Sequence, residues 1–243
     1  MIRIAAAGDV HYGLDSAGLM APHLERLPEC ADVLLLAGDL TQHGRADEAA
    51  VLAGELARVE VPVIAVLGNH DHESDEEVRI RALLEEVGVV VLEGESHTIE
   101  HAGGTVGVAG VKGFCGGFVG ASATDFGERE MKSFVRYARD EAGALERALG
   151  EISGADHRVA LMHYSPVKDT LHGEPPEIFA FLGSYLLAEA VDRAGADIAL
   201  HGHAHRGRDQ GVTPGGVPVR NVAQPVIRLP FRIFELGREA EAA

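Results

Sequence analysis

Five short motifs supply the kinds of side chain from which divalent metal sites are built. His201, His203 and His205 alternate with small residues directly after the apolar run 198–200. The other motifs also follow apolar runs, and they contain Asp9-Val10-His11, Asp39, Asn69-His70-Asp71 and His163. Oxygen and imidazole donors without a thiolate suit borderline ions such as Mn, Fe or Zn. The donors are too numerous for one tetrahedral ion, so they favour two metals about 3.5–4 Å apart.

The apolar runs before these motifs predict buried β-strands, and the segments between them predict helices. Helical spacing of apolar residues indicates helices over 19–27 and 47–59, and a third that Ser74 caps with Glu77 three residues later. Alternating strands and helices predict a largely parallel sheet with helices on its faces. Ligands collect outside the carboxyl ends of such strands. We therefore expect the five motifs to meet in space.

The second half of the chain predicts a more varied arrangement. Strands over 97–100 and 105–109 flank Gly103-Gly104 and predict an antiparallel hairpin. A loop rich in glycine and phenylalanine over 112–126 precedes a long helix over 128–149. A proline- and glycine-rich loop over 165–176, a helix over 182–194 and a strand over 197–200 follow, and then short strands. No linker interrupts the pattern, which predicts a single domain over 1–236 and a frayed tail over 237–243.

Composition limits the kinds of partner. The 243 residues are 46% hydrophobic and 24% charged, which is ordinary for a soluble globular protein. Two cysteines, no signal-peptide pattern and no long apolar run predict a reduced, cytoplasmic protein that does not bind membranes. The formal charge of −17 disfavours duplex nucleic acid, because grip on its phosphates requires a basic surface. A small phosphorylated substrate remains compatible, since bound metals reverse the local charge. The oligomeric state is not indicated.

The motif order resembles that of the calcineurin-like metallophosphoesterases. Asp9-x-His11, Gly38-Asp39, Gly68-Asn69-His70-Asp71, His163 and Gly202-His203-x-His205 match the family's motifs over residues 9–205. The resemblance implies an α/β fold, a four-layer α/β/β/α sandwich of two mixed β-sheets flanked by helices. It also implies two divalent metal ions with the following ligands: Asp9, His11 and His205 on the first, Asn69, His163 and His203 on the second, and Asp39 bridging both.

The same resemblance implies phosphoester hydrolysis by a metal-bridging hydroxide. His70 would give a proton or hydrogen bond to the leaving oxygen, and Asp71 would orient His70 through its other ring nitrogen. The chain departs from the phosphoprotein phosphatases, which have Arg where His43 stands and Glu where Asp71 stands. Both departures favour the bacterial phosphodiesterase and cyclic-nucleotide branches, although they leave the group that orients the substrate unidentified.

Several residues near the motifs have two open interpretations. His43, His72, Tyr164 and His201 either support the ligands and line the substrate site or are structural. The loops 113–118 and 165–176 either cover the site or anchor long connections. For the whole protein, a phosphodiesterase is the first hypothesis. The alternatives are a phosphomonoesterase of the same fold, a nuclease, which the acidic composition argues against, and a scaffold that has lost its chemistry.

Overall fold

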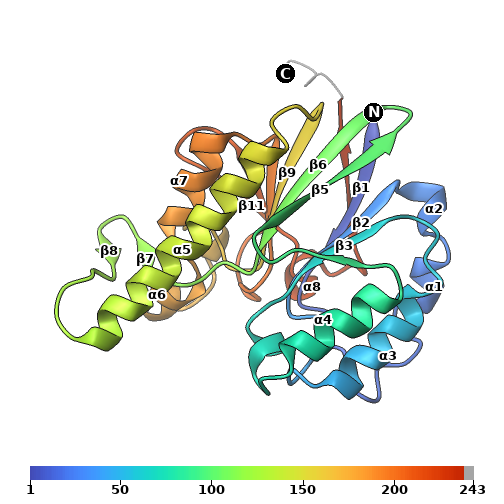
Figure 1. Cartoon of the computed structure of the whole chain (residues 1–243), viewed down its shortest axis with the longest axis horizontal. Coiled ribbons are helices and arrows are strands. Elements are labelled where there is room, and N and C mark those ends of the chain that lie inside the picture. The colour runs from blue at the N-terminus through green and yellow to red at the C-terminus, as the bar shows by residue number, and fades with distance from the viewer. Residues whose placement is uncertain (238–243) are drawn as a thin grey trace.

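In the computed structural model, which describes residues 1–237, two β-sheets lie face to face (Figure 1). The first sheet has the strand order β13-β1-β2-β3-β4. Its strands are β1 (Ile2–Ala7), β2 (Val33–Ala37), β3 (Val63–Val66), β4 (Val90–Val91) and β13 (Arg232–Leu236). The first four run parallel, and β13 pairs with β1 in the antiparallel sense. Strands β1, β2 and β3 are almost entirely apolar because both faces of the sheet are covered.

The second sheet is also mixed, with the order β11-β12-β10-β9-β6-β5. Its strands are β5 (Glu95–His101), β6 (Gly104–Val111), β9 (His157–Met162), β10 (Ile198–His201), β11 (Gln210–Val212) and β12 (Pro218–Asn221). The four inner strands are parallel, and the edge strands β5 and β11 are antiparallel to their neighbours. The predicted hairpin is confirmed as β5 and β6.

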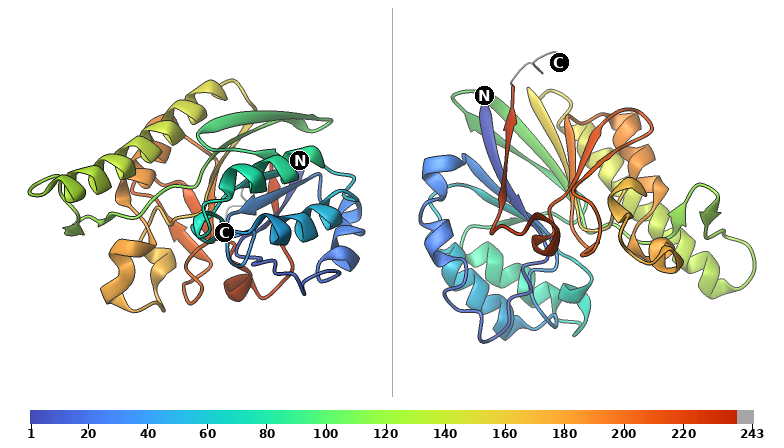
Figure 2. Two further views of the ribbon diagram at one scale, coloured as in Figure 1. Left: turned by 60° about the horizontal axis from the view of Figure 1, so that its bottom comes forward. Right: turned by 180° about the vertical axis from the view of Figure 1, so that it is seen from behind.

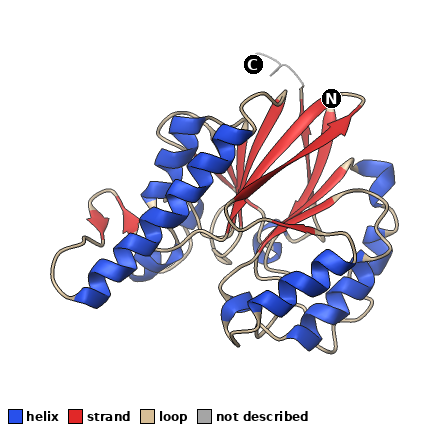
Figure 3. Ribbon diagram, viewed as in Figure 1, coloured by secondary structure: helices blue, strands red, loops and turns tan. Residues whose placement is uncertain are grey.

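Helices cover the outer face of each sheet, as the blue ribbons of Figure 3 show. On the first sheet these are α1 (Ala21–Leu24), α2 (Leu27–Cys30), α3 (Ala46–Leu56) and α4 (Glu77–Glu86). On the second sheet, α5 (Arg129–Glu151) and α7 (Tyr185–Ala194) pack side by side, as the view from behind in Figure 2 also shows. Between the sheets lies a buried apolar core that includes Ile4, Leu35, Ile64, Val108, Leu161 and Leu200. The predicted four-layer sandwich is confirmed.

Two helix predictions on the first sheet are corrected. The helix expected over 19–27 is split into α1 and α2, because Pro28 lacks an N–H and so stands in the first turn of a new helix. The expected cap by Ser74 is also wrong. Its hydroxyl donates to the carbonyl of His43 at 2.7 Å, and α4 begins only at Glu77.

An arm extends beyond the second sheet (Figure 1). It consists of β7 (Gly117–Phe118), β8 (Ala121–Ser122), α6 (Phe179–Leu182) and the first turns of α5. The predicted loop 112–126 therefore contains a small hairpin. The predicted helix over 182–194 begins later, as α7, where the Ser184 hydroxyl accepts from the amide of Leu186.

Short elements complete the fold. They are the 3-10 turns η1 (His70–His72), η2 (Asp169–Leu171) and η3 (Pro176–Ile178), and the helix α8 (Gln224–Ile227). Of the predicted tail over 237–243, only Gly237 is among the described residues, and 238–243 lie outside them. Within residues 1–237, no helix combines the length and the apolar character that crossing a membrane requires.

The core between the sheets predicts a large effect of truncation at Leu35. Leu35 is fully buried there, so Leu35→Ala is expected to lower the free energy of unfolding by about 2–5 kcal/mol. Urea denaturation of the metal-free protein measures this change. Leu14→Ala is the control, because Leu14 is 60% exposed and its loss is expected to cost less than about 0.5 kcal/mol. Equal effects of the two substitutions would contradict the proposed core.

Candidate metal centre

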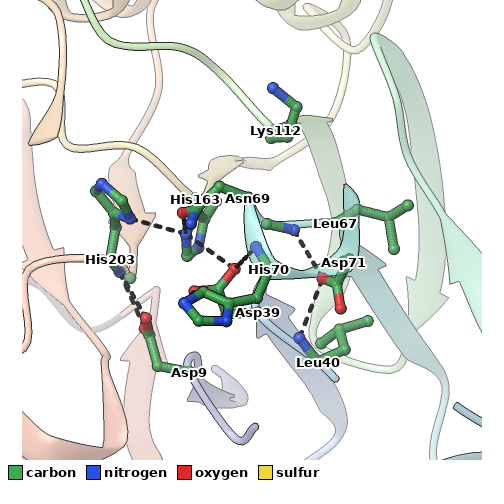
Figure 4. Close-up of polar contacts among 12 residues, drawn as sticks. Asp9, Asp39, Leu40, Leu67, Asn69, His70, Asp71, Lys112, His163 and His203 are labelled. Carbon is green, nitrogen blue, oxygen red and sulfur yellow. Dashed lines mark hydrogen bonds and ion pairs between the residues drawn. The ribbon is translucent and has the colours of Figure 1, made fainter. Parts of the chain in front are cut away.

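The seven predicted ligands meet where strands of both sheets end. Asp9 and His11 follow β1, Asp39 follows β2 and Asn69 follows β3 in the first sheet. His163 follows β9, and His203 and His205 follow β10 in the second sheet. Figure 4 shows five of them, Asp9, Asp39, Asn69, His163 and His203, with side chains directed toward one another. Because all five strands are parallel within their sheets, their carboxyl ends lie at one edge of the sandwich.

Two glycines make room for the carboxylates at these strand ends. A Cβ atom on Gly68 would overlap Oδ1 and the backbone nitrogen of Asp39. A Cβ atom on Gly202 would overlap Oδ2 of Asp9. The backbone of one sheet therefore approaches the side chain of a neighbouring strand end more closely than any other residue type permits. Both glycines belong to the motifs that define the site.

Several of the predicted ligands also have a strained backbone conformation. Six non-glycine residues between Met1 and Gly237 have positive φ, and four of them are Asp9 (57°), His11 (43°), Asp39 (49°) and His203 (69°). Left-handed backbone costs free energy for residues with a Cβ atom, and such strain concentrates at functional sites. The observed strain is thus consistent with side chains that must point into one small volume.

One cluster consists of His163, His203, Asn69 and Asp39. The His163 Nδ1 atom lies 2.9 Å from the carbonyl of Ala37, and the His203 Nε2 atom lies 3.3 Å from the carbonyl of Phe181. A carbonyl only accepts, so those two nitrogens carry the hydrogens, and His163 Nε2 and His203 Nδ1 carry lone pairs.

These two lone pairs face each other at 3.1 Å. Two acceptor oxygens lie beside His163 Nε2, the amide oxygen of Asn69 at 2.9 Å and Oδ1 of Asp39 at 3.3 Å. With both rings neutral, four acceptors thus converge without a hydrogen between them, which is unfavourable unless a cation or a proton sits among them. Burial lowers the pKa of His203 to about 3, so its ring is neutral and available as a ligand at neutral pH.

A second cluster consists of Asp9, His11, His205 and Asp39. Burial opposes ionisation of Asp9, but the hydrogen bond from His205, at 2.8 Å, and the surrounding histidines outweigh it and hold the Asp9 pKa below its usual value. Burial lowers the pKa of His11 to about 4, so this ring is neutral as well. Its Nε2 atom is buried and has no hydrogen-bond partner among the described residues.

Asp39 belongs to both clusters, as a bridging ligand must. Its Oδ2 atom lies 3.8 Å from His11 Nε2, and its Oδ1 atom accepts from the backbone amide of His70 at 2.8 Å. Burial and the neighbouring charge of Asp9 raise the pKa of Asp39, and only a protonated His163 would oppose this. Two divalent cations fit this donor set, because they would pair the unpartnered His11 nitrogen and offset two adjacent buried carboxylates.

His70 lies at the edge of this site, with its ring 39% exposed. Its Nδ1 atom lies 2.8 Å from the carbonyl of Gln42, and its Nε2 atom lies 4.0 Å from Oδ2 of Asp39. The ring packs edge to face against His11 with a centroid distance of 4.6 Å. The Gln42 carbonyl therefore fixes Nδ1 as a donor, and Nε2 is directed toward the site.

The predicted orientation of His70 by Asp71 is wrong. Asp71 is fully buried, and its carboxylate accepts from the backbone amides of Leu40, Thr41 and Gly68 and from the Thr41 hydroxyl. Figure 4 shows the contact with Leu40. It points away from the His70 ring because the backbone turns sharply at η1. Asp71 instead ties together the loops that present Asp39 and Asn69.

The four flanking residues with open interpretations fall into different environments. His201 is fully buried and contacts the Thr170 hydroxyl at 2.8 Å, so it is a core residue that supports the loop after β9. The ring of Tyr164 lies 4.4 Å from that of His203 and lines the site. His43 is paired with Glu48 at 3.0 Å. His72 has a buried Nε2 atom without a hydrogen-bond partner among the described residues.

Several contributors to the site were not identified from the sequence. Asn221 is buried and donates to the carbonyl of Ala204 at 2.8 Å, which fixes the segment between His203 and His205. The carbonyls of Phe181 and Gln42 set the tautomers of His203 and His70. Asn221 is the last residue of β12, and the predicted ligands also lie at the ends of strands. This position is the one feature of the sequence that could have identified Asn221. Backbone carbonyls have no sequence signature.

Comparison with known proteins gave one family and several related folds. A sequence model described as calcineurin-like phosphoesterase matches residues 2–207. The phosphopantetheinyl hydrolase PptH from Mycobacterium tuberculosis superposes with a TM-score of 0.67 at 19% identity, covering 93% of this chain and 90% of that one. TT1561 from Thermus thermophilus superposes with a TM-score of 0.59 at 21% identity, covering 90% and 88%. A comparison with curated proteins gave no match. At these identities the solved structures show a shared fold.

The close approach at Gly68 predicts that a single methyl group disrupts the site. Gly68→Ala is expected to reduce bound Mn²⁺ to below about one ion per chain, because the Cβ atom would displace Asp39 from both clusters. Elemental analysis after Mn²⁺ loading and desalting measures this. Gly54→Ala is the matched control, since nothing lies within 4 Å of a Cβ atom there and alanine favours the helix. Full metal content in Gly68→Ala would refute the argument.

The corrected position of Asp71 predicts a structural phenotype. Asp71→Asn places an amide donor among backbone amides, and it should lower the free energy of unfolding by about 1–3 kcal/mol. Urea denaturation compares it with Asp47→Asn, whose carboxylate is 46% exposed. If Asp71→Asn kept full stability and metal content but lost turnover, the orienting role would be restored.

Proposed function

The chain belongs to the calcineurin-like phosphoesterase family, and on that premise we propose that it is a dimetal phosphodiesterase acting on small phosphorylated substrates. The observation that carries the proposal is the sharing of Asp39 between two clusters of ligand atoms. Inactive scaffolds of a metal-dependent fold need no such convergence. Here seven donors from two sheets meet at the strained strand ends.

Seven residues of this chain would hold the two ions. Asp9, His11 and His205 would hold one, Asn69, His163 and His203 the other, and Asp39 would bridge them. The donor set of oxygen and imidazole favours Mn, Fe or Zn. Two such ions supply a lowered pKa for water and positive charge beside the phosphoryl oxygens. The chain contributes the fixed positions and tautomers of its donors, so little reorganisation is required during the reaction.

His70 is the proposed proton donor to the leaving oxygen. Its Nδ1–H is committed to the Gln42 carbonyl, so the protonated ring donates from Nε2, which faces the site. Its partly exposed position allows the ring to exchange protons with solvent between turnovers. Histidine suits this task because its ordinary pKa lies near neutral pH.

The proposed preference for a diester rests on charge. The chain has a formal charge of −17, and a monoester dianion is repelled more strongly than a diester monoanion. The ammonium of Lys112 is buried against aromatic rings rather than presented to a phosphate, although the Lys112 carbonyl accepts from the His163 amide and so lies close to the site. The same charge argues against duplex nucleic acid and anionic membranes as partners. A monoesterase of the same fold is the second candidate, since the metal clusters serve either ester.

We also propose a reducing, cytoplasmic location. Cys30 and Cys115 are both unpaired, and Cys115 is buried. Free cysteines persist in reducing compartments, where glutathione keeps thiols reduced. The predicted metal ligands include no cysteine, so the metal centre itself does not require a reduced thiol.

Two substrates test the proposed reaction. The Mn²⁺-loaded protein is expected to hydrolyse bis-p-nitrophenyl phosphate with a higher kcat/KM than p-nitrophenyl phosphate. A higher value for the monoester would overturn the diester preference and leave the phosphohydrolase intact. Hydrolysis of neither, together with less than about one ion bound per chain, would favour the scaffold.

The role of His70 predicts a separation of metal binding from turnover. His70→Ala is expected to keep full Mn²⁺ content and to lower kcat by about 10²–10⁴, because the ring is directed at the site without belonging to either ligand cluster. Steady-state kinetics and elemental analysis measure the two effects. His43→Ala is the control, since that ring is half-exposed and paired with Glu48. Equal turnover of His70→Ala and the unsubstituted protein would remove His70 from the mechanism.

A further inference from the structure

An apolar groove lies in the arm beside the metal centre. Its volume is about 380 Å³, and its walls are Met131 and Phe134 of α5, Ala180 and Phe181 of α6, and Gly116 and Ala123 of the β7–β8 segment. Glu130 is the one charged residue in its lining. A cavity of about 150 Å³ holds a benzene molecule, so the apolar groove accommodates a group larger than one aromatic ring.

Both walls of the apolar groove connect to the metal ligand His203. On the α6 wall, the Phe181 carbonyl accepts from His203 Nε2 at 3.3 Å. On the α5 wall, a chain of rings leads from His203 through Tyr164 and Phe114 to Phe134, with centroid distances of 4.4, 5.9 and 5.1 Å. The groove therefore lies next to the site where the phosphate would bind, one residue away through Phe181, and on the side of His203 rather than of His70.

The side chains of the apolar groove are exposed beyond what the fold requires. Phe181 is 61% exposed and Met131 is 41% exposed, whereas the apolar side chains of the cores around both sheets are buried. Grouped apolar side chains in water indicate a binding surface more often than scattered ones do. Binding pockets of this size are mainly apolar, with a few polar groups that fix orientation. Here the predicted metal ligands, which Phe181 contacts through its carbonyl, would supply that polar function beside the groove.

We propose that the apolar groove binds an apolar group, alkyl or aryl, that the substrate carries on its phosphate. This inference rests on the proposed phosphoesterase function and narrows its substrate class. Phosphoesters with an extended apolar substituent fit the groove, whereas a sugar or a second phosphate would lose hydration there without gaining a polar partner. The phosphate anchors one end at the metal centre, and the groove buries the other.

A series of n-alkyl phosphates, from ethyl to octyl, tests the proposal by binding rather than turnover. Isothermal titration of the Mn²⁺-loaded protein is expected to show Kd falling by about two- to fourfold for each added methylene until the groove is filled. The heat-capacity change should become more negative along the series. A Kd independent of chain length would overturn the proposal. If ethyl phosphate and inorganic phosphate also fail to bind, the phosphoesterase function itself fails, so the two failures are distinguishable.

Variants of the arm locate the effect. Met131→Glu is expected to abolish the dependence of Kd on chain length, because it places a carboxylate in the apolar wall. Phe181→Ala should weaken the dependence while keeping the carbonyl that supports His203. Phe126→Ala is the control: Phe126 is 87% exposed and lies outside the groove, so its series should match that of the unsubstituted protein.

The oligomeric state of the same variants separates substrate binding from self-association. Size-exclusion chromatography with light scattering is expected to give the same mass for Met131→Glu and the unsubstituted protein. A dimer that Met131→Glu converts to a monomer would assign the groove to a second copy of the chain and overturn the proposal. Retention of the full chain-length dependence in Met131→Glu would overturn it as well.

Discussion

The site depends on lone pairs that are forced together. His163 and His203 each donate one ring hydrogen to a backbone carbonyl, so their other nitrogens face each other as acceptors at 3.1 Å. Asp39 adds a buried carboxylate that Asp9 already destabilises. With neutral rings and no cation this arrangement is repulsive, and with a cation it would be a preformed set of ligands. Features that are unfavourable for the metal-free chain, including the positive φ of four ligands, therefore serve cation binding.

The two-sheet architecture makes this convergence possible and also makes it cooperative. One sheet supplies Asp9, His11, Asp39 and Asn69, and the other supplies His163, His203 and His205. Neither sheet alone places four ligands around either ion. The buried apolar core between the sheets sets the distance between them. Backbone pairing of Gly8 with Val222 and Ala223 joins the two sheets near the site. Metal affinity and inter-sheet packing are thus linked, because loss of one removes the partner that the other requires.

The sequence predicted the parts of the structure that depend on local pattern. Apolar runs located the strands, and the polar residues after these runs lie together in the structure, because parallel strand ends share one edge. The failures have physical causes as well. Asp71 follows His70 in the sequence, but the η1 turn directs its carboxylate to backbone amides instead. The groups that fix the tautomers are the carbonyls of Ala37, Phe181 and Gln42, which side-chain identity does not reveal. The arm depends on long-range packing of α6 against β7, which no local spacing encodes.

Phe181 joins the candidate metal centre to the apolar groove. Its carbonyl contacts His203, which requires a fixed backbone, while its side chain lies exposed in the apolar groove. The carbonyl contact is independent of side-chain identity, so substitution at 181 alters the groove without altering the hydrogen bond that sets the His203 tautomer. The same holds at Met131, which contributes to the groove from α5 and to no ligand. In the proposed function, the chemistry is confined to strand ends held by two sheets, and the apolar groove of the arm would select the substrate through side chains that contact no predicted ligand.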